Sequence, residues 1–217
     1  MDADTLLIHE IFTSIQGEST FVGLPCVFVR LSGCNLRCSW CDTPGAWAGG
    51  EPIRRDEVSS RALQPGIELV EVTGGEPLLQ PGTLPLLGEL CDAGRTVLLE
   101  TNGSLDVSRV DPRVHRIVDL KSPSSGQHQL NREDNVRLLT ARDEIKFVLA
   151  DRADYEWMRH MIERHRLDRL GVALLASCVW GRLDGRELVR WVLEDRLSVR
   201  VQVQLHKVLW GGSAQRV

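Results

Sequence analysis

The chain has 217 residues, of which 42% are hydrophobic and 26% are charged, and its formal net charge is −4. This length can bury a sizeable core, so we expect residues 1–217 to form a single domain. The mixed charges argue against a nucleic-acid partner. The start M-D-A-D-T shows no secretory signal and no run of about 18 apolar residues follows, so we expect no membrane contact and a cytoplasmic location.

Short apolar runs alternate with helical patterns along the chain. Because most of the runs are continuously apolar, they are typical of buried parallel strands. They are Pro25–Leu31, Ile67–Thr73, Thr96–Thr101, Arg116–Leu120, Glu144–Leu149, Gly171–Ala176 and Val199–Leu205. Apolar spacing predicts helices over Thr83–Asp92, Asp151–Arg166 and Asp184–Asp195. The alternation predicts an α/β fold, a partial (incomplete) β/α barrel of about six parallel strands.

The segment C-N-L-R-C-S-W-C places Cys34, Cys38 and Cys41 in a C-x3-C-x2-C array. Thiolates are the usual ligands of a [4Fe–4S] cluster, and three of them leave one iron open for a small molecule. Structural zinc takes four protein ligands, so a zinc-stabilised binding module would need a fourth Cys or His from elsewhere in the chain. Both readings stay open here. The apolar surroundings of Cys26 and Cys91 predict that these two are core residues.

Small polar motifs follow three successive predicted strands. They are T-G-G-E-P (Thr73–Pro77), T-N-G (Thr101–Gly103) and K-S-P-S-S-G (Lys121–Gly126). Each motif alone is ordinary turn chemistry. Because catalytic residues of parallel barrels gather at the carboxyl ends of the strands, their joint placement beside the cysteine loop predicts one site at this rim.

Arginine outnumbers lysine 23 to three in this chain. The lysines are Lys121, Lys146 and Lys207, at strand ends or in motif-like stretches. A lysine retained in such a composition can mark a place that needs a compact ammonium rather than a planar guanidinium. Chance accounts for the pattern equally well.

The cysteine array resembles the cluster motif of the radical S-adenosylmethionine (SAM) enzymes, and T-G-G-E resembles their GGE motif. Further stretches resemble the 7-carboxy-7-deazaguanine synthase family: E-I-F-T-S-I-Q-G-E-S (Glu10–Ser19), V-R-L-S-G-C (Val29–Cys34), C-D-T (Cys41–Thr43) and Q-L-H-K-V-L-W-G (Gln204–Gly211). The resemblance implies a radical SAM core that converts 6-carboxy-5,6,7,8-tetrahydropterin to 7-carboxy-7-deazaguanine with release of ammonia, on the route to queuosine and other 7-deazapurines.

The same resemblance implies one [4Fe–4S] cluster per subunit, SAM, Mg²⁺, an external one-electron reductant and a homodimer. By position, Cys34, Cys38 and Cys41 would bind the cluster and Thr43 the Mg²⁺. The residues that would contact SAM are Trp40, Asp42, Gly75, Ser122, Pro123, Ser124 and Ser177. Those that would contact the pterin are Ile15, Gln16, Gly17, Glu18, Arg30, Thr73 and His206, the last from the final strand.

Some of these residues have simpler explanations, and one position departs from the family pattern. By sequence alone Thr43 is better explained as a turn cap. An alternative role for Trp40 is to shield the cluster from water without contacting SAM. Cys178 stands where the family has a proline after Ser177, which leaves that loop's geometry open. The nearest enzyme alternative is a glycyl-radical-enzyme activase, which shares the cluster motif but needs a groove for a polypeptide. I-Q-G-E and Q-L-H-K favour a closed pocket for a small molecule instead.

Overall fold

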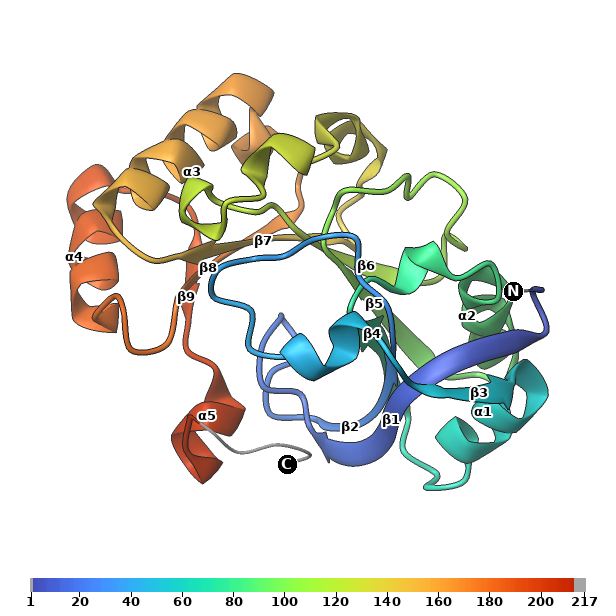
Figure 1. Cartoon of the computed structure of the whole chain (residues 1–217). Helices are drawn as coiled ribbons and strands as arrows, with labels where there is room; N and C mark the ends of the chain where they lie inside the picture. The colour runs from blue at the N-terminus through green and yellow to red at the C-terminus, as the bar shows by residue number, and fades with distance from the viewer. Residues whose placement is uncertain (1, 213–217) are drawn as a thin grey trace.

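The structure, a computed structural model, describes residues 2–212, and within them nine strands form one open sheet (Figure 1). Its order is β3-β1-β2-β4-β5-β6-β7-β8-β9. The strands are β1 (Thr5–Ile15), β2 (Pro25–Leu31), β3 (Glu51–Arg54), β4 (Leu69–Gly74), β5 (Thr96–Thr101), β6 (His115–Asp119), β7 (Glu144–Leu149), β8 (Ala173–Cys178) and β9 (Arg200–Gln202). From β2 to β9 all neighbours are parallel, and β1 is antiparallel to both β2 and β3. The predicted partial barrel is confirmed, with seven parallel strands.

Four helices cover the outer face of this curved sheet, and a fifth short helix ends the described chain (Figure 1). They are α1 (Arg55–Leu63), α2 (Thr83–Asp92), α3 (Arg152–His165), α4 (Gly185–Asp195) and α5 (Leu205–Trp210). All three predicted helices are confirmed. Asp151 and Asp184 cap α3 and α4 by accepting hydrogen bonds from backbone N–H groups of the first turn.

The sequence prediction missed β1, β3 and α1. Only Val58 and Ala62 of α1 are buried, so the helix lacks a wide apolar stripe that could reveal it. The last predicted strand, Val199–Leu205, is shorter than expected. Its alternating V-Q-V-Q-L pattern favours a strand, but only Arg200–Gln202 pair with β8, and the chain turns into α5 at Leu205.

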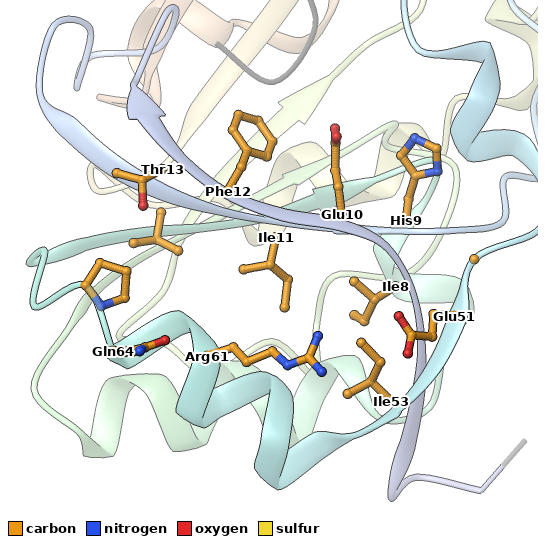
Figure 2. A pocket seen from close by; sticks show the side chains of 13 residues that line it. Ile8, His9, Glu10, Ile11, Phe12, Thr13, Glu51, Ile53, Arg61 and Gln64 are labelled. Atoms are coloured by element: carbon orange, nitrogen blue, oxygen red, sulfur yellow. The ribbon is translucent and has the colours of Figure 1, made fainter.

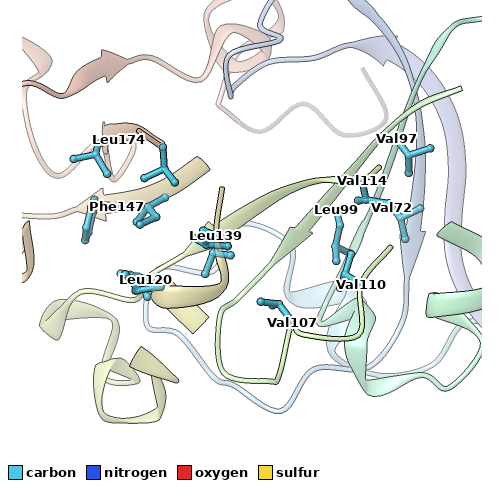
Figure 3. Packing of buried hydrophobic residues seen from close by; sticks show 14 of the residues in the cluster. Val72, Val97, Leu99, Val107, Val110, Val114, Leu120, Leu139, Phe147 and Leu174 are labelled. Atoms are coloured by element: carbon cyan, nitrogen blue, oxygen red, sulfur yellow. The ribbon is translucent and has the colours of Figure 1, made fainter. Parts of the chain in front are cut away.

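The main hydrophobic core lies between the sheet and its helices (Figure 3). Val72, Leu99, Phe147 and Leu174 extend into it from four strands and are 0–4% exposed. Full burial of a side chain of this size contributes roughly 1.5–3 kcal/mol. The next residue on each strand points the other way, into the lumen of the barrel.

The lumen is lined in two layers. Its lower layer, towards the amino ends of the strands, is apolar and contains Cys26, Phe28, Leu69, Leu98 and Ile117. Phe12 of β1 stacks on Phe28 with ring centroids 5.0 Å apart. Cys26 is therefore a core residue as predicted, and Cys91 packs against the main core. The upper layer is polar and charged.

The β1–β2 connection, residues 16–24, closes the lower end of this open barrel. Thr20 N donates to Glu144 Oε1 at the start of β7 (3.1 Å), and Gln202 Nε2 of β9 donates to Ser19 O (2.7 Å). The Phe21 ring meets the His115 ring of β6 edge-on, with centroids 4.9 Å apart. Ser19 adopts a left-handed conformation, φ +63°, to make this turn. The I-Q-G-E segment therefore rises inside the lumen.

Across residues 2–212, no helix is both long enough and apolar enough to cross a bilayer.

Candidate active site

The three motif cysteines lie in the loop that follows β2, and all three thiols are free. Leu36 N (3.4 Å) and Asn102 Nδ2 (3.8 Å) donate hydrogen bonds to Cys34 Sγ. N–H donors directed at a thiolate sulfur stabilise its charge, as the ligands of an iron–sulfur cluster require. Burial raises the pKa of Cys38, and the nearby Lys121 ammonium opposes this effect. The thiols and their donors fit a cluster.

The loop after β4 packs against the cysteine loop without space for a side chain. A Cβ on Gly75 would lie 2.2 Å from Gly33 O and 2.8 Å from Ala46 O. Glu76 N donates to Gly33 O (2.8 Å), and the buried Glu76 carboxyl accepts from Asn102 N (2.7 Å). Glu76 thus ties three of the rim loops together, and burial raises its pKa in spite of these hydrogen bonds.

The K-S-P-S-S loop after β6 completes the rim. Ser39 Oγ donates to Ser124 O (2.7 Å), and the Trp40 indole N–H donates to Ser124 Oγ (3.0 Å). Asp154 of α3 accepts from Ser124 N (2.9 Å), so the helix fixes this loop against the cysteine loop. Pro123 begins a short 3₁₀ turn, and the buried Ser122 hydroxyl donates to Val148 O. The loops that carry the predicted motifs therefore contact one another at this rim, as the sequence predicts.

All three lysines of the chain extend to this site, and each pairs with acidic residues. Lys121 Nζ lies 2.6 Å from Asp119 and 5.4 Å from the Trp40 ring centroid, and Lys207 Nζ lies 2.9 Å from Asp42. Lys146 lies between two carboxylates. Its Nζ is 2.5 Å from Glu18 Oε2 and 2.7 Å from Glu100 Oε1. The three retained lysines therefore all form ion pairs at one rim of the sheet, and a functional need for an ammonium there stays a prediction.

Several polar atoms in the upper lumen are buried and have no hydrogen-bond partner among residues 2–212. Three of them are Glu18 Oε1, Asp119 Oδ1 and Ser177 Oγ. Buried polar atoms nearly always have a partner in a folded protein, because leaving one unsatisfied costs about 1–3 kcal/mol. Atoms of this kind, directed into one lumen, indicate a ligand that supplies hydrogen-bonding groups.

Gln16 and Glu71 form a buried pair below these acceptors. Gln16 Nε2 donates to Glu71 Oε2, and Gln16 Oε1 accepts from Glu18 N (3.1 Å). Burial raises the pKa of Glu71 well above its usual range, and the nearby Glu100 carboxylate adds to the effect. For Glu100, burial is the largest single effect and would raise the pKa, but Lys146, Lys121 and Arg30 together outweigh it and lower the pKa. Both ends of the Gln16 amide are therefore used to shape the I-Q-G-E turn.

Helix α5 lies over the I-Q-G-E turn. Leu205 N donates to Gly17 O (2.9 Å), and a Cβ on Gly17 would be only 2.2 Å from His206 Nδ1. Burial lowers the pKa of His206 in spite of nearby Glu18, which favours the neutral form of the ring. His206 thus reaches the site from a helix rather than from the predicted final strand, and Ile15 ends β1 just before this turn.

The remaining predicted residues lie at the same rim. Arg30 and Thr73 are paired in register on β2 and β4, and Arg30 Nε donates to Glu10 Oε1 of β1 (2.8 Å). Thr43 Oγ1 donates to Asp42 Oδ1 (3.1 Å) directly after the cysteine array. A hydroxyl and a carboxylate are oxygen ligands of the kind that Mg²⁺ accepts. In the described part of the chain, no three His, Cys, Asp or Glu side chains converge on one point for a single metal ion.

Glu10, Glu71, Glu100 and Asp119 were not among the predicted site residues, and Lys146 was noted only as one of the three lysines. Glu71 and Lys146 each interrupt the apolar residues of a parallel strand at a lumen-facing position, and Glu100 directly follows the apolar residues of β5. Glu10 lies on the antiparallel β1 beside His9, and Asp119 ends β6, so neither carries this signal. That interruption was the available signal, because a charge in a buried parallel strand needs a partner.

A pocket of about 490 Å³ on the other side of β1 is separate from this site (Figure 2). Ile11 points into it from β1, opposite Arg61 of α1 and Gln64 just after this helix, whereas Phe12 and Glu10 point to the opposite side of the strand. It therefore lies between β1 and α1, outside the lumen.

Known proteins resemble the chain along nearly all of its length. The Radical SAM superfamily matches residues 28–166. Over 216 residues the chain is 50% identical to 7-carboxy-7-deazaguanine synthase of Chlorobaculum tepidum, and this alignment covers 98% of this chain and 97% of that protein. The same-named protein of Koribacter versatilis is 43% identical over 218 residues, covering 94% and 96%. The crystal structure of QueE from Escherichia coli has a TM-score of 0.78 at 24% identity and covers 93% of this chain and 95% of its own, which shows the shared fold.

The partial barrel, its cysteine loop and the superfamily match define the class of protein: it is a radical SAM enzyme, of the kind that carries a [4Fe–4S] cluster and binds SAM. Relatives at 50% and 43% identity over nearly the whole chain then narrow the class. The chain belongs to the 7-carboxy-7-deazaguanine synthase family, which the sequence resemblance had predicted.

Proposed function

We propose that the protein converts 6-carboxy-5,6,7,8-tetrahydropterin to 7-carboxy-7-deazaguanine and ammonia. The two ring systems differ by one NH₃, so the overall reaction needs no net oxidant. The observation that carries this proposal is the set of buried, unpartnered polar atoms in the lumen, Glu18 Oε1, Asp119 Oδ1 and Ser177 Oγ. A pterin offers ring N–H and amino donors to such acceptors, and Glu18 Oε1 lies in the turn that the resemblance assigns to the substrate.

Cys34, Cys38 and Cys41 would hold the cluster. Bound together, the cluster and SAM supply the one-electron chemistry that generates an organic radical. Trp40, Asp42, Gly75, Ser122, Pro123, Ser124 and Ser177 would contact SAM. Within this set the Ser122 hydroxyl is used to fix the loop, whereas Ser177 Oγ is one of the unpartnered atoms. The division of roles favours Ser177 as a direct contact and Ser122 as a support of its loop.

The pterin would lie against the lumen wall formed by Ile15, Gln16, Gly17, Glu18, Arg30, Thr73 and His206. The guanidinium of Arg30 is suited to the substrate carboxylate, because its planar fork matches two carboxylate oxygens. The neutral His206 ring can donate one further hydrogen bond to it. Gln16 acts through the shape of the turn, since its amide is already paired on both sides.

Mg²⁺ would bind Thr43, with Asp42 beside it. Their hydroxyl and carboxylate oxygens suit this hard cation, and the substrate carboxylate can complete the set. Lys207 holds Asp42 Oδ2 at 2.9 Å, so a metal at Asp42 would use the other oxygen or displace the ammonium.

The finer assignments extend the same proposal. We infer an external one-electron reductant, a homodimer, and a cytoplasmic location, where reducing conditions keep the six cysteines as thiols. The product would enter queuosine or another 7-deazapurine. One sheet that runs from Thr5 to Gln202 supports a single domain.

The test is an anaerobic assay with reconstituted enzyme, SAM, Mg²⁺, a reductant and the carboxytetrahydropterin. We expect the deazaguanine chromophore and one ammonia per product. Cys38→Ser is the cofactor control, and Cys91→Ser, remote from the cluster loop, is the matched cysteine control that keeps activity. SAM cleavage that occurs only with a partner polypeptide would favour the activase. Reconstituted protein that contains zinc but no iron or sulfide would contradict the proposed radical SAM activity.

A further inference from the structure

Lys146 is the most deeply buried of the three lysines, and its side chain is 8% exposed. It projects from the middle of β7 into the lumen, paired in register with Asp119 of β6. Its ammonium contacts Glu18 and Glu100, which belong to the I-Q-G-E turn and to β5. One cation thus joins β7 to two other segments, whose contacting residues lie 46 and 128 positions away from Lys146 in the sequence.

The ammonium engages only one oxygen of Glu18. Glu18 Oε2 lies 2.5 Å from Lys146 Nζ, whereas Glu18 Oε1 is buried and has no partner within the described residues. A carboxylate held in this way has a fixed direction, and its second oxygen is the atom available to a ligand.

We propose that Lys146 is the positioning residue of the substrate site, holding Glu18 and Glu100 together so that they present fixed acceptor oxygens to the N–H edge of the pterin ring. This inference rests on the proposed function. Without the ammonium, two carboxylates whose oxygens share one cation would repel each other and separate.

The surrounding charges agree with this role. Burial is the largest single effect and would lower the pKa of Lys146, but Glu100, Glu18 and Asp119 together outweigh it and raise the pKa well above its usual range. Other charged and titratable groups surround the ion pairs of Lys146 with Glu18 and Glu100. They are Arg30 of β2, Glu71 of β4, Asp119 of β6, Lys121 of the loop after β6, Glu144 of β7 and His206 of α5. A compact ammonium fits between two carboxylates where a guanidinium fork would push them apart.

The test compares equilibrium binding of the pterin to anaerobic, SAM-loaded wild type, Lys146→Met, Glu18→Gln and the double variant. We expect Lys146→Met to weaken the pterin Kd at least tenfold and to raise KM more than it lowers kcat, because the N–H and amino groups of the pyrimidinone ring are retained in the product and do not react. Affinity for SAM and the spectrum of the cluster should stay unchanged. Glu18→Gln should add little in the Lys146→Met background, because the lysine acts through that carboxylate.

Arg116→Met is the matched control, since Arg116 forms a buried ion pair with Asp143 (2.6 Å) that lies at the other end of β6. It should lose stability but keep the pterin Kd. Should Lys146→Met fail to fold, Lys146→Gln replaces it in the same cycle, because its amide can still donate to one carboxylate. The inference would be overturned if Lys146→Met bound the pterin with the wild-type Kd. It would also be overturned if the losses of affinity in Lys146→Met and Glu18→Gln simply added in the double variant. Wild type that binds SAM but not the pterin would instead refute the proposed function.

Discussion

At the scale of single residues, two glycines hold the site together by leaving space. Gly75 allows the loop after β4 to touch the cysteine loop, and Gly17 allows His206 to lie on the I-Q-G-E turn. Neither has a positive φ in this structure, so the requirement is for space rather than for backbone freedom.

Gly75→Ala should separate the two loops, because its Cβ would lie 2.2 Å from a backbone oxygen that cannot rotate away. We expect at least a tenfold loss in SAM affinity, measured anaerobically by equilibrium binding, with iron and sulfide content determined alongside. Gly88→Ala is the matched control. Gly88 lies inside α2 with nothing within 4 Å of a new Cβ, so this change should stabilise the fold by roughly 0.5–1 kcal/mol and leave SAM binding intact. Equal SAM affinity in both variants would argue against the contact.

At the scale of elements, α5 depends on the site more than on the core. None of its six residues is buried, and Val208 and Leu209 are more than half exposed. An isolated helix of this length is unstable, so its contacts with the I-Q-G-E turn and Asp42 must supply its order.

Gly17→Ala should release α5, because the new methyl group would occupy the place of the His206 ring. Amide hydrogen exchange over residues 205–210 should become at least tenfold faster, while exchange in β4 and β5 stays slow. Gly185→Ala, at the start of α4 with nothing within 4 Å, is the control and should leave α5 protected. Unchanged exchange of α5 in Gly17→Ala would show that other contacts hold the helix.

At the scale of the whole molecule, buried carboxyl groups are satisfied either by hydrogen bonds, as at Glu76 and Asp154, or by an ion pair. One pair lies away from the site: the Arg116 guanidinium donates two hydrogen bonds to Asp143, which is 1% exposed. Burial alone would raise the pKa of Asp143, but the hydrogen bonds from Arg116 outweigh it and lower the pKa.

Arg116→Met should cost about 3–5 kcal/mol at pH 7, since it leaves a buried carboxylate without its counter-ion. A depressed pKa contributes stability above the unfolded value of about 3.9, and this contribution is lost as the pH falls through the folded value. The difference between wild type and variant should therefore shrink below about pH 4. Urea unfolding at pH 7 and between pH 5 and pH 3 measures it. A constant difference across this range would contradict the assignment.

The predictable parts of this molecule are those encoded locally. The parallel strands and three helices follow from periodicity within about 15 residues. The meeting of Cys34, Gly75 and Asn102 follows from one rule, that parallel strands end at the same rim. The contact of Lys146 with Glu18 spans 128 residues and depends on how far the I-Q-G-E turn rises in the lumen, which no local pattern specifies. Likewise, α5 takes its conformation from a turn near the other end of the chain.

The loop that closes the lower lumen sets an order on folding. Residues 16–24 are among the first to leave the ribosome, yet Ser19 waits for Gln202, 183 residues later, before its contact can form. Closing so long a loop costs entropy that only the completed chain recovers, whereas the β4–β5 and β5–β6 pairings form over shorter separations. The β1–β2 connection, residues 16–24, therefore reaches its final position after the parallel sheet around it has formed. A nascent chain that has not yet reached β9 would have its cysteine loop but would lack the contacts of Gln202 and Leu205 with the β1–β2 connection, so this end of the site would still be incomplete.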